Sequence, residues 1–162
     1  MHQAAILGDT DDIIKNLLKF NANVNILNEN NQSPLHLACG KNRVENVRLL
    51  INVNGIDLNG KDKYGFTPLL KAIASLSFES ALLLLNLCSN DLDINAADNL
   101  GNTALHYSME ENHKEISCLL IDCGADYLVK NSEGKFCIDM VNNDNFKLEM
   151  LEFVKQYKGT EK

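Results

Sequence analysis

The chain repeats one short phrase at an almost constant interval. The four copies are NQSPLHLAC from Asn31, GFTPLLKAI from Gly65, GNTALHYSM from Gly101 and a divergent GKFCIDMV from Gly134. Their starting residues lie 34, 36 and 33 positions apart. A period of roughly 20 to 50 residues is typical of stacked modules, in which each module packs only on its neighbours. The repeat therefore predicts a solenoid of similar units rather than one spherical core.

Each phrase is followed by a second apolar segment and a closing phrase. The second segments are VENVRLLI from Val44, FESALLLL from Phe78, KEISCLLI from Lys114 and FKLEMLEFV from Phe146, and the closing phrases are NANVN (21–25), GIDLN (55–59), LDIN (92–95) and GADYL (124–128). Ser33, Thr67 and Thr103 stand where a helix needs an oxygen to cap its first N–H groups. Pro34 and Pro68 follow them, at a position where the first helical turn tolerates proline. The predicted unit is therefore turn, helix, turn, helix and loop.

These phrases resemble the ankyrin repeat family, whose module of about 33 residues consists of a β-turn and two helices. The resemblance is carried by SPLHLAC, TPLLKAI, TALHYSM, LLIDCGAD and the turns DKYG (62–65) and DNLG (98–101), and it covers essentially the whole chain. It implies an all-α ankyrin-repeat solenoid of stacked helix-turn-helix units with short β-hairpin loops. We expect a single domain, 1–162, with repeats of about 1–28, 29–62, 63–98, 99–131 and 132–157, the first truncated and the last a degenerate cap.

The third repeat departs most from the family pattern. Leu70 stands where the family places a His that bonds to the neighbouring turn, and Leu76 replaces a turn Gly. Extra residues also lengthen the loop at 89–92. A missing hydrogen bond and a longer loop both weaken local structure. We therefore expect the backbone amides in the hairpin and loop of the third repeat to be less protected against hydrogen exchange than those of the fourth.

The leucine run 82–85 is interpreted as the buried stripe of the third repeat rather than an exposed docking patch.

Composition excludes several classes of function. The formal net charge of -7 argues against nucleic-acid binding, which usually needs a basic patch. The longest apolar run, 81–85, is far too short to span a bilayer, and no secretory signal is recognisable. The five cysteines are odd in number and do not have the spacing of a disulfide framework. We expect a monomeric cytoplasmic or nuclear protein that neither inserts into membranes nor binds nucleic acid.

The cysteine and histidine residues suggest a second hypothesis about the function. His36 and Cys39 lie three residues apart on a predicted helix, and Cys118 and Cys123 bracket another. No further Cys/His pair lies at zinc-finger spacing, and the repeat gives each residue a structural role. We predict no enzymatic activity, no metal and no cofactor. The alternative function is an enzyme or metal-binding protein that uses these Cys and His residues.

The leading prediction is a non-enzymatic module that binds another protein. In a solenoid, equivalent positions of successive repeats line up into one continuous surface. The resemblance places the partner-binding residues on hairpin tips and first helices of the concave face: Lys41, Lys61, Lys63, Tyr64, Phe66, Ala74, Ser75, Asn99, Leu100, Asn102, Glu110, Glu111, Lys130 and Glu133. The compact build looks like that of the cyclin-dependent kinase inhibitors or of gankyrin-like assembly chaperones. An adaptor, an inhibitor or an assembly chaperone would all fit.

Large apolar residues at hairpin tips are the predicted anchors. Tyr64, Phe66 and Leu100 occupy tips where burial within the chain is not expected, and aromatic residues are frequent interface hot spots. For Phe66 the alternative is that it covers the neighbouring hairpin.

The charges along the same face have an order. Lys41, Lys61 and Lys63 belong to the second and third repeats, whereas Glu110 and Glu111 belong to the fourth. The pattern predicts a partner with an acidic patch, an apolar centre and a basic patch in matching order.

Overall fold

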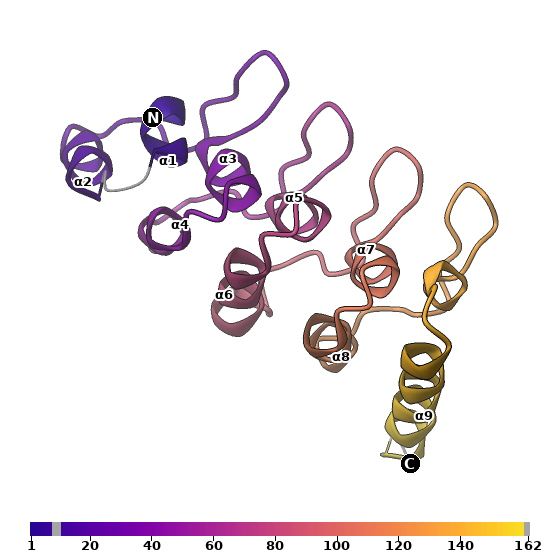
Figure 1. Cartoon of the computed structure of the whole chain (residues 1–162). Helices are drawn as coiled ribbons and strands as arrows, with labels where there is room; N and C mark the ends of the chain where they lie inside the picture. Colours follow the sequence, from indigo (N-terminus) through magenta and orange to yellow (C-terminus); the bar gives the residue numbers. More distant parts are fainter. Residues whose placement is uncertain (8–10, 161–162) are drawn as a thin grey trace.

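The helices lie in two parallel rows. The computed structural model describes residues 1–7 and 11–160. The first helices of the successive units are α1 (His2–Ile6), α3 (Pro34–Gly40), α5 (Pro68–Ala74), α7 (Ala104–Glu110) and the 3-10 helix η1 (Cys137–Met140). The second helices are α2 (Asp11–Lys19), α4 (Val44–Ile51), α6 (Phe78–Cys88), α8 (Lys114–Asp122) and α9 (Asp144–Thr160). Figure 1 shows loops projecting from the first helices on the side away from the second helices. The predicted all-α solenoid is confirmed.

The projecting loops are hairpins in shape but carry almost no sheet. Within the described residues the only β pairings assigned are two isolated bridges, between Ala97 and Thr103 and between Lys130 and Phe136. In the same part of the chain no helix is both long and apolar enough to cross a membrane.

Helix starts follow the predicted caps. The Ser33 Oγ accepts a hydrogen bond from the His36 N–H (3.4 Å), and the Ser33 N–H donates to His36 Nδ1 (3.1 Å). Thr67 Oγ1 accepts from the Leu70 N–H at 3.3 Å, so α5 begins in the same way. Thr103 donates its N–H to His106 Nδ1 at 3.2 Å. Because a helix this short has marginal stability alone, these contacts help to fix where α3, α5 and α7 start.

Each hairpin is organised by one side-chain oxygen. Asp62 Oδ1 accepts from the N–H groups of Tyr64 (2.8 Å) and Phe66 (3.1 Å). The equivalent residues Asn28, Asp98 and Asn131 accept from the N–H groups two and four positions further along. Asp and Asn favour such turns because their short side chains reach their own backbone. The hairpins are thus compact units with a defined backbone.

Backbone hydrogen bonds tie each hairpin to the next. The three bonds run from Lys63 N to Asn30 O (3.0 Å), from Asn99 N to Tyr64 O (3.0 Å) and from Ser132 N to Leu100 O (2.9 Å). The hairpins are therefore linked to one another in a continuous row.

A row of asparagines joins the closing loops of successive units. Asn25, Asn59 and Asn95 each donate their side-chain amide to a carbonyl of the following loop, at 2.7, 2.7 and 3.3 Å. Each also accepts from a backbone N–H of that loop, at 2.9, 2.8 and 2.8 Å. One residue type at one repeat position thus links neighbouring units throughout the described stack.

The family histidine contacts the following hairpin. Nε2 of His2, His36 and His106 lies 3.0, 3.0 and 3.2 Å from the carbonyl oxygens of Gln32, Phe66 and Lys135. Each of these carbonyls belongs to the residue just before the cap of the next first helix. The contact expected from the resemblance is confirmed, and it crosses from one unit to the next.

Leu70 therefore weakens a different hairpin from the one predicted. Leu70 is buried, and the carbonyl that a His at this position would reach is that of Asn102, in the fourth repeat. The missing hydrogen bond belongs to hairpin 98–103, not to the hairpin of the third repeat. The sequence correctly indicated that Leu70 removes a hydrogen bond, but the hairpin that loses this bond is the one in the following repeat.

This difference predicts an order of hydrogen exchange. The amides of Asp62, Asp98 and Asn131 each donate to the carbonyl at the far side of their own hairpin, at 2.9 to 3.0 Å. In hairpin 98–103 that carbonyl lacks the histidine bond, so this hairpin should open more easily. We expect a lower protection factor for the Asp98 amide than for those of Asp62 and Asn131, measured by NMR-detected exchange. Equal or higher protection of Asp98 would contradict this assignment.

The hydrophobic core is a band between the two rows of helices. Its fully buried side chains come from both rows and from every inner unit, and include Leu35, Leu50, Ile73, Leu84, Leu105 and Leu120. The leucine run follows the prediction: Leu82 is partly buried and residues 83–85 are buried. Each unit packs on its neighbours, as expected of a solenoid.

Candidate functional site

The predicted partner-binding residues lie on one surface. We call the hairpins 28–33, 62–67, 98–103 and 131–136, each with the residue that precedes it, together with the C-terminal ends of α3, α5 and α7, the concave surface. Most candidates are exposed there: Lys41, Lys61, Lys63, Tyr64, Ser75, Asn99, Leu100, Glu110, Glu111, Lys130 and Glu133. Phe66, Ala74 and Asn102 are partly buried. The repeat thus brings residues from four units to one side of the molecule.

Tyr64 and Leu100 are exposed apolar side chains on a fixed backbone. They are 52% and 61% exposed. The Tyr64 carbonyl accepts the Asn99 N–H, and the Leu100 carbonyl accepts the Ser132 N–H and hydroxyl. The Lys63 ammonium lies 4.9 Å from the centre of the Tyr64 ring. Because the backbone is already ordered, a partner that covers these side chains loses less conformational entropy on binding.

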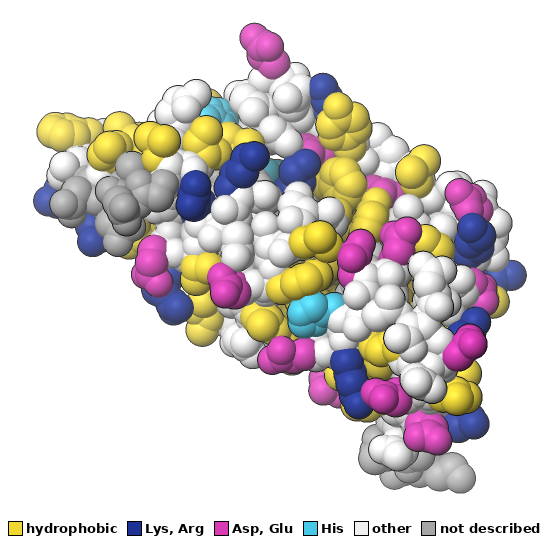
Figure 2. Space-filling model, in the orientation of Figure 1, with side chains coloured by type: hydrophobic (Ala, Val, Ile, Leu, Met, Phe, Trp, Pro, Cys, Tyr) yellow, Lys and Arg dark blue, Asp and Glu magenta, His cyan; other side chains and the backbone are white. Residues whose placement is uncertain are grey.

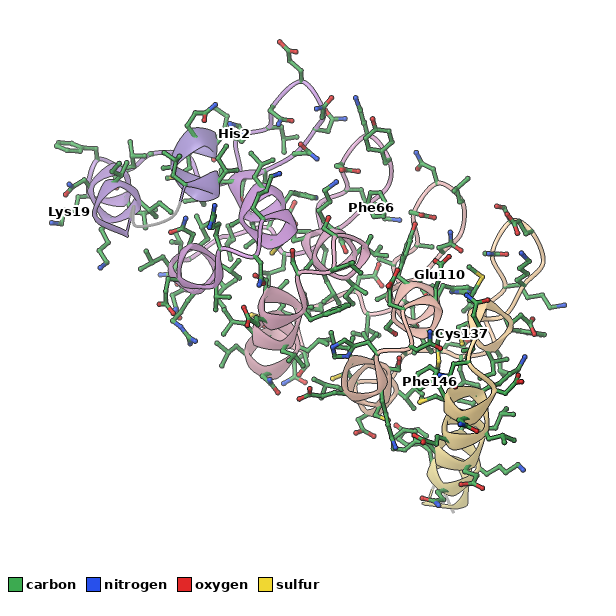
Figure 3. All side chains as sticks on the ribbon, in the orientation of Figure 1. His2, Lys19, Phe66, Glu110, Cys137 and Phe146 are labelled. Atoms are coloured by element: carbon green, nitrogen blue, oxygen red, sulfur yellow. The ribbon has the colours of Figure 1, made fainter. Side chains whose placement is uncertain are left out.

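Phe66 is partly buried and contacts a side chain of the next unit. Its ring centre lies 5.9 Å from that of Tyr107 on α7, with the planes tilted by 48°, and the Lys71 ammonium lies 5.3 Å from its centre. Figure 3 shows Phe66 at the base of its hairpin, with Glu110 on α7. The Tyr107 hydroxyl in turn donates to the Asp98 carboxylate. Phe66 therefore packs on the first helix of the next unit.

Lys71 and Tyr107 are surface residues that the sequence analysis missed. Both lie four residues after the cap of their helix, at the position that Leu37 occupies in α3. All three are partly exposed, because this position faces the hairpins rather than the second helices. Comparing this one position across the repeats would have identified them.

Lys41, Lys61, Lys63, Lys71 and Lys130 on this surface form no ion pair with a described carboxylate. The ion pairs found in the described residues are Arg48 with Glu45, Lys114 with Glu149, and Lys135 with Glu133. Figure 2 shows basic side chains over α3 and α5 and acidic ones over α7. The predicted charge order is therefore present as a surface pattern. The last hairpin contributes less, because its Glu133 is already paired.

His36, Cys39 and Cys137 occupy positions where their side chains are hydrogen-bonded or buried within the repeat stack. His36 accepts the Ser33 N–H at Nδ1 and points Nε2 at the Phe66 carbonyl, so both ring nitrogens are engaged. Cys39 is fully buried, and burial raises the pKa of its thiol far above the ordinary value, so the thiol stays protonated. Burial also raises the pKa of Cys137, to about 12. Among the described residues no three His, Cys, Asp or Glu side chains gather as metal ligands would.

The buried histidines predict a pH dependence of stability. Burial lowers the pKa of His36 and His106 below 6.5, although carbonyl hydrogen bonds and nearby carboxylates oppose the shift. On acidification the unfolded chain therefore binds protons before the folded chain does, so stability is complete above about pH 7 and falls as the pH drops through 6.5. We expect a lower Tm at pH 5.5 than at pH 7.5. The double variant His36→Gln/His106→Gln should show a smaller difference, and curves that stay parallel to the wild type would contradict the assignment.

Comparison with known proteins agrees with this geometry. A family model of ankyrin repeats in three copies matches residues 1–98, and a single ankyrin-repeat model matches residues 100–132. SMC5-SMC6 complex localization factor protein 1 of Homo sapiens is 32% identical over 126 residues, which are 76% of this chain and 12% of that protein. Neurogenic locus notch homolog protein 1 of Homo sapiens is 32% identical over 121 residues, or 75% of this chain and 5% of that protein.

A third relative is alpha-latrotoxin-Lg1a of Latrodectus geometricus, 28% identical over 130 residues, which are 80% of this chain and 9% of the toxin. The chain thus spans only 5 to 12% of the length of these relatives. The family models, by contrast, cover most of the chain. The chain belongs to the ankyrin-repeat family, whose repeats bind other proteins.

Proposed function

We propose that the chain is a non-enzymatic adaptor that binds a partner protein through the concave surface. The observation that carries the proposal is the pair Tyr64 and Leu100, exposed apolar side chains on hairpins that backbone hydrogen bonds lock together. Exposed aromatic residues on an ordered backbone are suited to act as anchors of an interface. One relative is named as a localization factor of a protein complex, which supports an adaptor over an inhibitor or an assembly chaperone.

The charges on either side of the anchors set how the partner is oriented. Lysines surround α3 and α5, whereas Glu110 and Glu111 end α7. Charges at the rim of an interface act mainly on association rate and orientation. The partner therefore carries an acidic region, an apolar centre and a basic region in matching order.

Binding kinetics separate these roles once a partner has been identified by affinity purification. Tyr64→Ala removes an anchor and should speed dissociation about 5- to 30-fold, equivalent to about 1 to 2 kcal/mol. Glu110→Lys with Glu111→Lys should slow association instead, and the effect should shrink as salt rises. Surface plasmon resonance at two salt concentrations measures both rates.

Variants on the second helices provide the control. Glu45→Ala changes an exposed side chain on α4, away from the concave surface. It should leave both rates unchanged. If Glu45→Ala abolished binding while the concave variants bound normally, the surface assignment would be wrong. The alternative of an enzyme or metal-binding protein draws no support from Cys39 and Cys137, whose thiols are buried and protonated.

A further inference from the structure

A small pocket opens on the concave surface between α3 and α5. It has a volume of about 250 Å³ and lies between the C-terminal halves of the two helices. Its walls include Gly40 and Lys41 from the end of α3, Lys71 from α5 and Ser75 just after it. The pocket therefore belongs to the lysine-rich half of the surface.

Gly40 creates the space for this pocket. The equivalent residues at the ends of the next first helices are Ala74 and Glu110, so only α3 ends without a side chain at this position. A Cβ atom at Gly40 would lie 3.2 Å from Lys71 Cγ and 3.3 Å from Lys71 Cε. The Lys71 stem therefore packs directly over the glycine, and its ammonium lies beside the Phe66 ring.

The charge at the pocket is opposite to that of the whole protein. The protein carries a formal charge of -7, yet neither Lys41 nor Lys71 pairs with a carboxylate among the described residues. The nearby Asp62 is already engaged, because it accepts from two backbone N–H groups and from the Gln32 amide. Two lysines thus line the pocket, and neither is paired with a described carboxylate.

Size and chemistry together define the occupant. Sites for small-molecule ligands usually measure about 300 to 1,000 Å³, so this pocket suits a single side chain better than a metabolite. His36 has both ring nitrogens engaged, and the Gln32 side chain is bonded to Asp62 and Asn28. This leaves Lys41, Lys71 and the Ser75 hydroxyl as the polar side chains of the lining that can meet a ligand. Ammonium groups only donate hydrogen bonds, so the complementary group is a negatively charged acceptor. The Phe66 ring lies 5.3 Å from the Lys71 ammonium, and Phe66 in turn contacts the Tyr107 ring.

We propose that this pocket seats the carboxylate of an Asp or Glu in an acidic partner segment whose neighbouring aromatic residue packs on Phe66 and Tyr107. The inference rests on the proposed function, because it names the chemistry that the concave surface recognises. It also assigns a specificity role to Gly40 and Lys71.

An NMR titration with a defined peptide tests the pocket without the natural partner. The probe is the octapeptide Glu-Glu-Phe-Glu-Glu-Phe-Glu-Glu, added to ¹⁵N-labelled protein. Amide shifts should concentrate at Gly40, Lys41, Lys71 and Ser75. Lys41→Gln with Lys71→Gln should weaken binding about tenfold, whereas the matched control Lys147→Gln with Lys155→Gln on α9 should change it less than twofold.

Gly40→Ala distinguishes the effect of the pocket's shape on peptide binding from the effect of its charge. It keeps both lysines and favours the helix, but its methyl group displaces the Lys71 stem. We expect at least threefold weaker peptide binding with no loss of Tm. If the α9 control weakens binding as much as the pocket variant, or Gly40→Ala binds normally, general charge attraction explains the binding and the proposal is wrong. Tighter binding of a phosphoserine peptide of equal charge would overturn the carboxylate assignment.

The two proposals fail in different ways. If the natural partner covers the concave surface but the peptide shifts no pocket amide, the proposed function stands and this inference is wrong. If the partner covers the second helices instead, the proposed function is wrong, and the pocket does not recognise that partner.

Discussion

Leu84→Ala should lower the free energy of unfolding by about 2 to 5 kcal/mol, because it leaves a cavity at the centre of the stack. Leu84 is 0% exposed and belongs to α6, which packs between α4 and α8. A solenoid has no distant contacts that could compensate, since each unit touches only its neighbours. Urea denaturation followed by circular dichroism measures the loss.

Leu87 on the same helix provides the matched control. It is 57% exposed, so Leu87→Ala removes the same atoms from a surface position and should change stability by less than about 0.5 kcal/mol. Similar losses for the two variants would contradict the assignment of Leu84 to the core band.

Gly65→Ala should also be strongly destabilising, by on the order of 2 to 3 kcal/mol. Gly65 has φ +84°, and a Cβ atom there would lie 2.8 Å from the Asn99 nitrogen and 3.0 Å from the Asp98 carbonyl carbon. Both atoms are backbone and cannot move without separating the hairpins. The variant should therefore also break the bond from Asn99 N to Tyr64 O and weaken partner binding.

Gly55→Ala measures the free-energy cost of a positive φ without the steric clash that Gly65→Ala adds. Gly55 has φ +80° but no atom within 4 Å of the Cβ position, so it carries only the conformational cost, roughly 1 kcal/mol. Thermal denaturation of both variants gives the difference. If they lose equal stability, the close approach of the hairpins contributes nothing.

Much of the architecture could be predicted because each unit uses the same local signals. Ser33 and Thr67 cap helices, and Leu76 replaces a turn glycine, as the sequence indicated. The structure gives Leu76 a φ of +57°, at the position where the neighbouring units have Asn42 (+51°) and Asn112 (+53°). Asparagine tolerates this conformation better than leucine does. The sequence therefore located a strained turn from residue identity alone.

Contacts between units were harder to predict. The effect of Leu70 falls on the following hairpin, because the histidine bond spans two repeats and a single repeat does not reveal its direction. Phe66 rests on Tyr107 for the same reason: their contact joins a hairpin to a helix about 40 residues later in the chain. Lys71 is identified as a surface residue of the site by its contacts with Gly40 and Phe66, which come from two different repeats.

Hydrogen exchange of the complex with the natural partner tests the central claim most directly. Binding through the concave surface should slow exchange in hairpins 62–67 and 98–103 and at the ends of α5 and α7, while α4, α6 and α8 keep their free-protein rates. Mass spectrometry of the free and bound protein gives both sets of rates. Protection confined to α4, α6 and α8, with unchanged hairpins, would contradict the account.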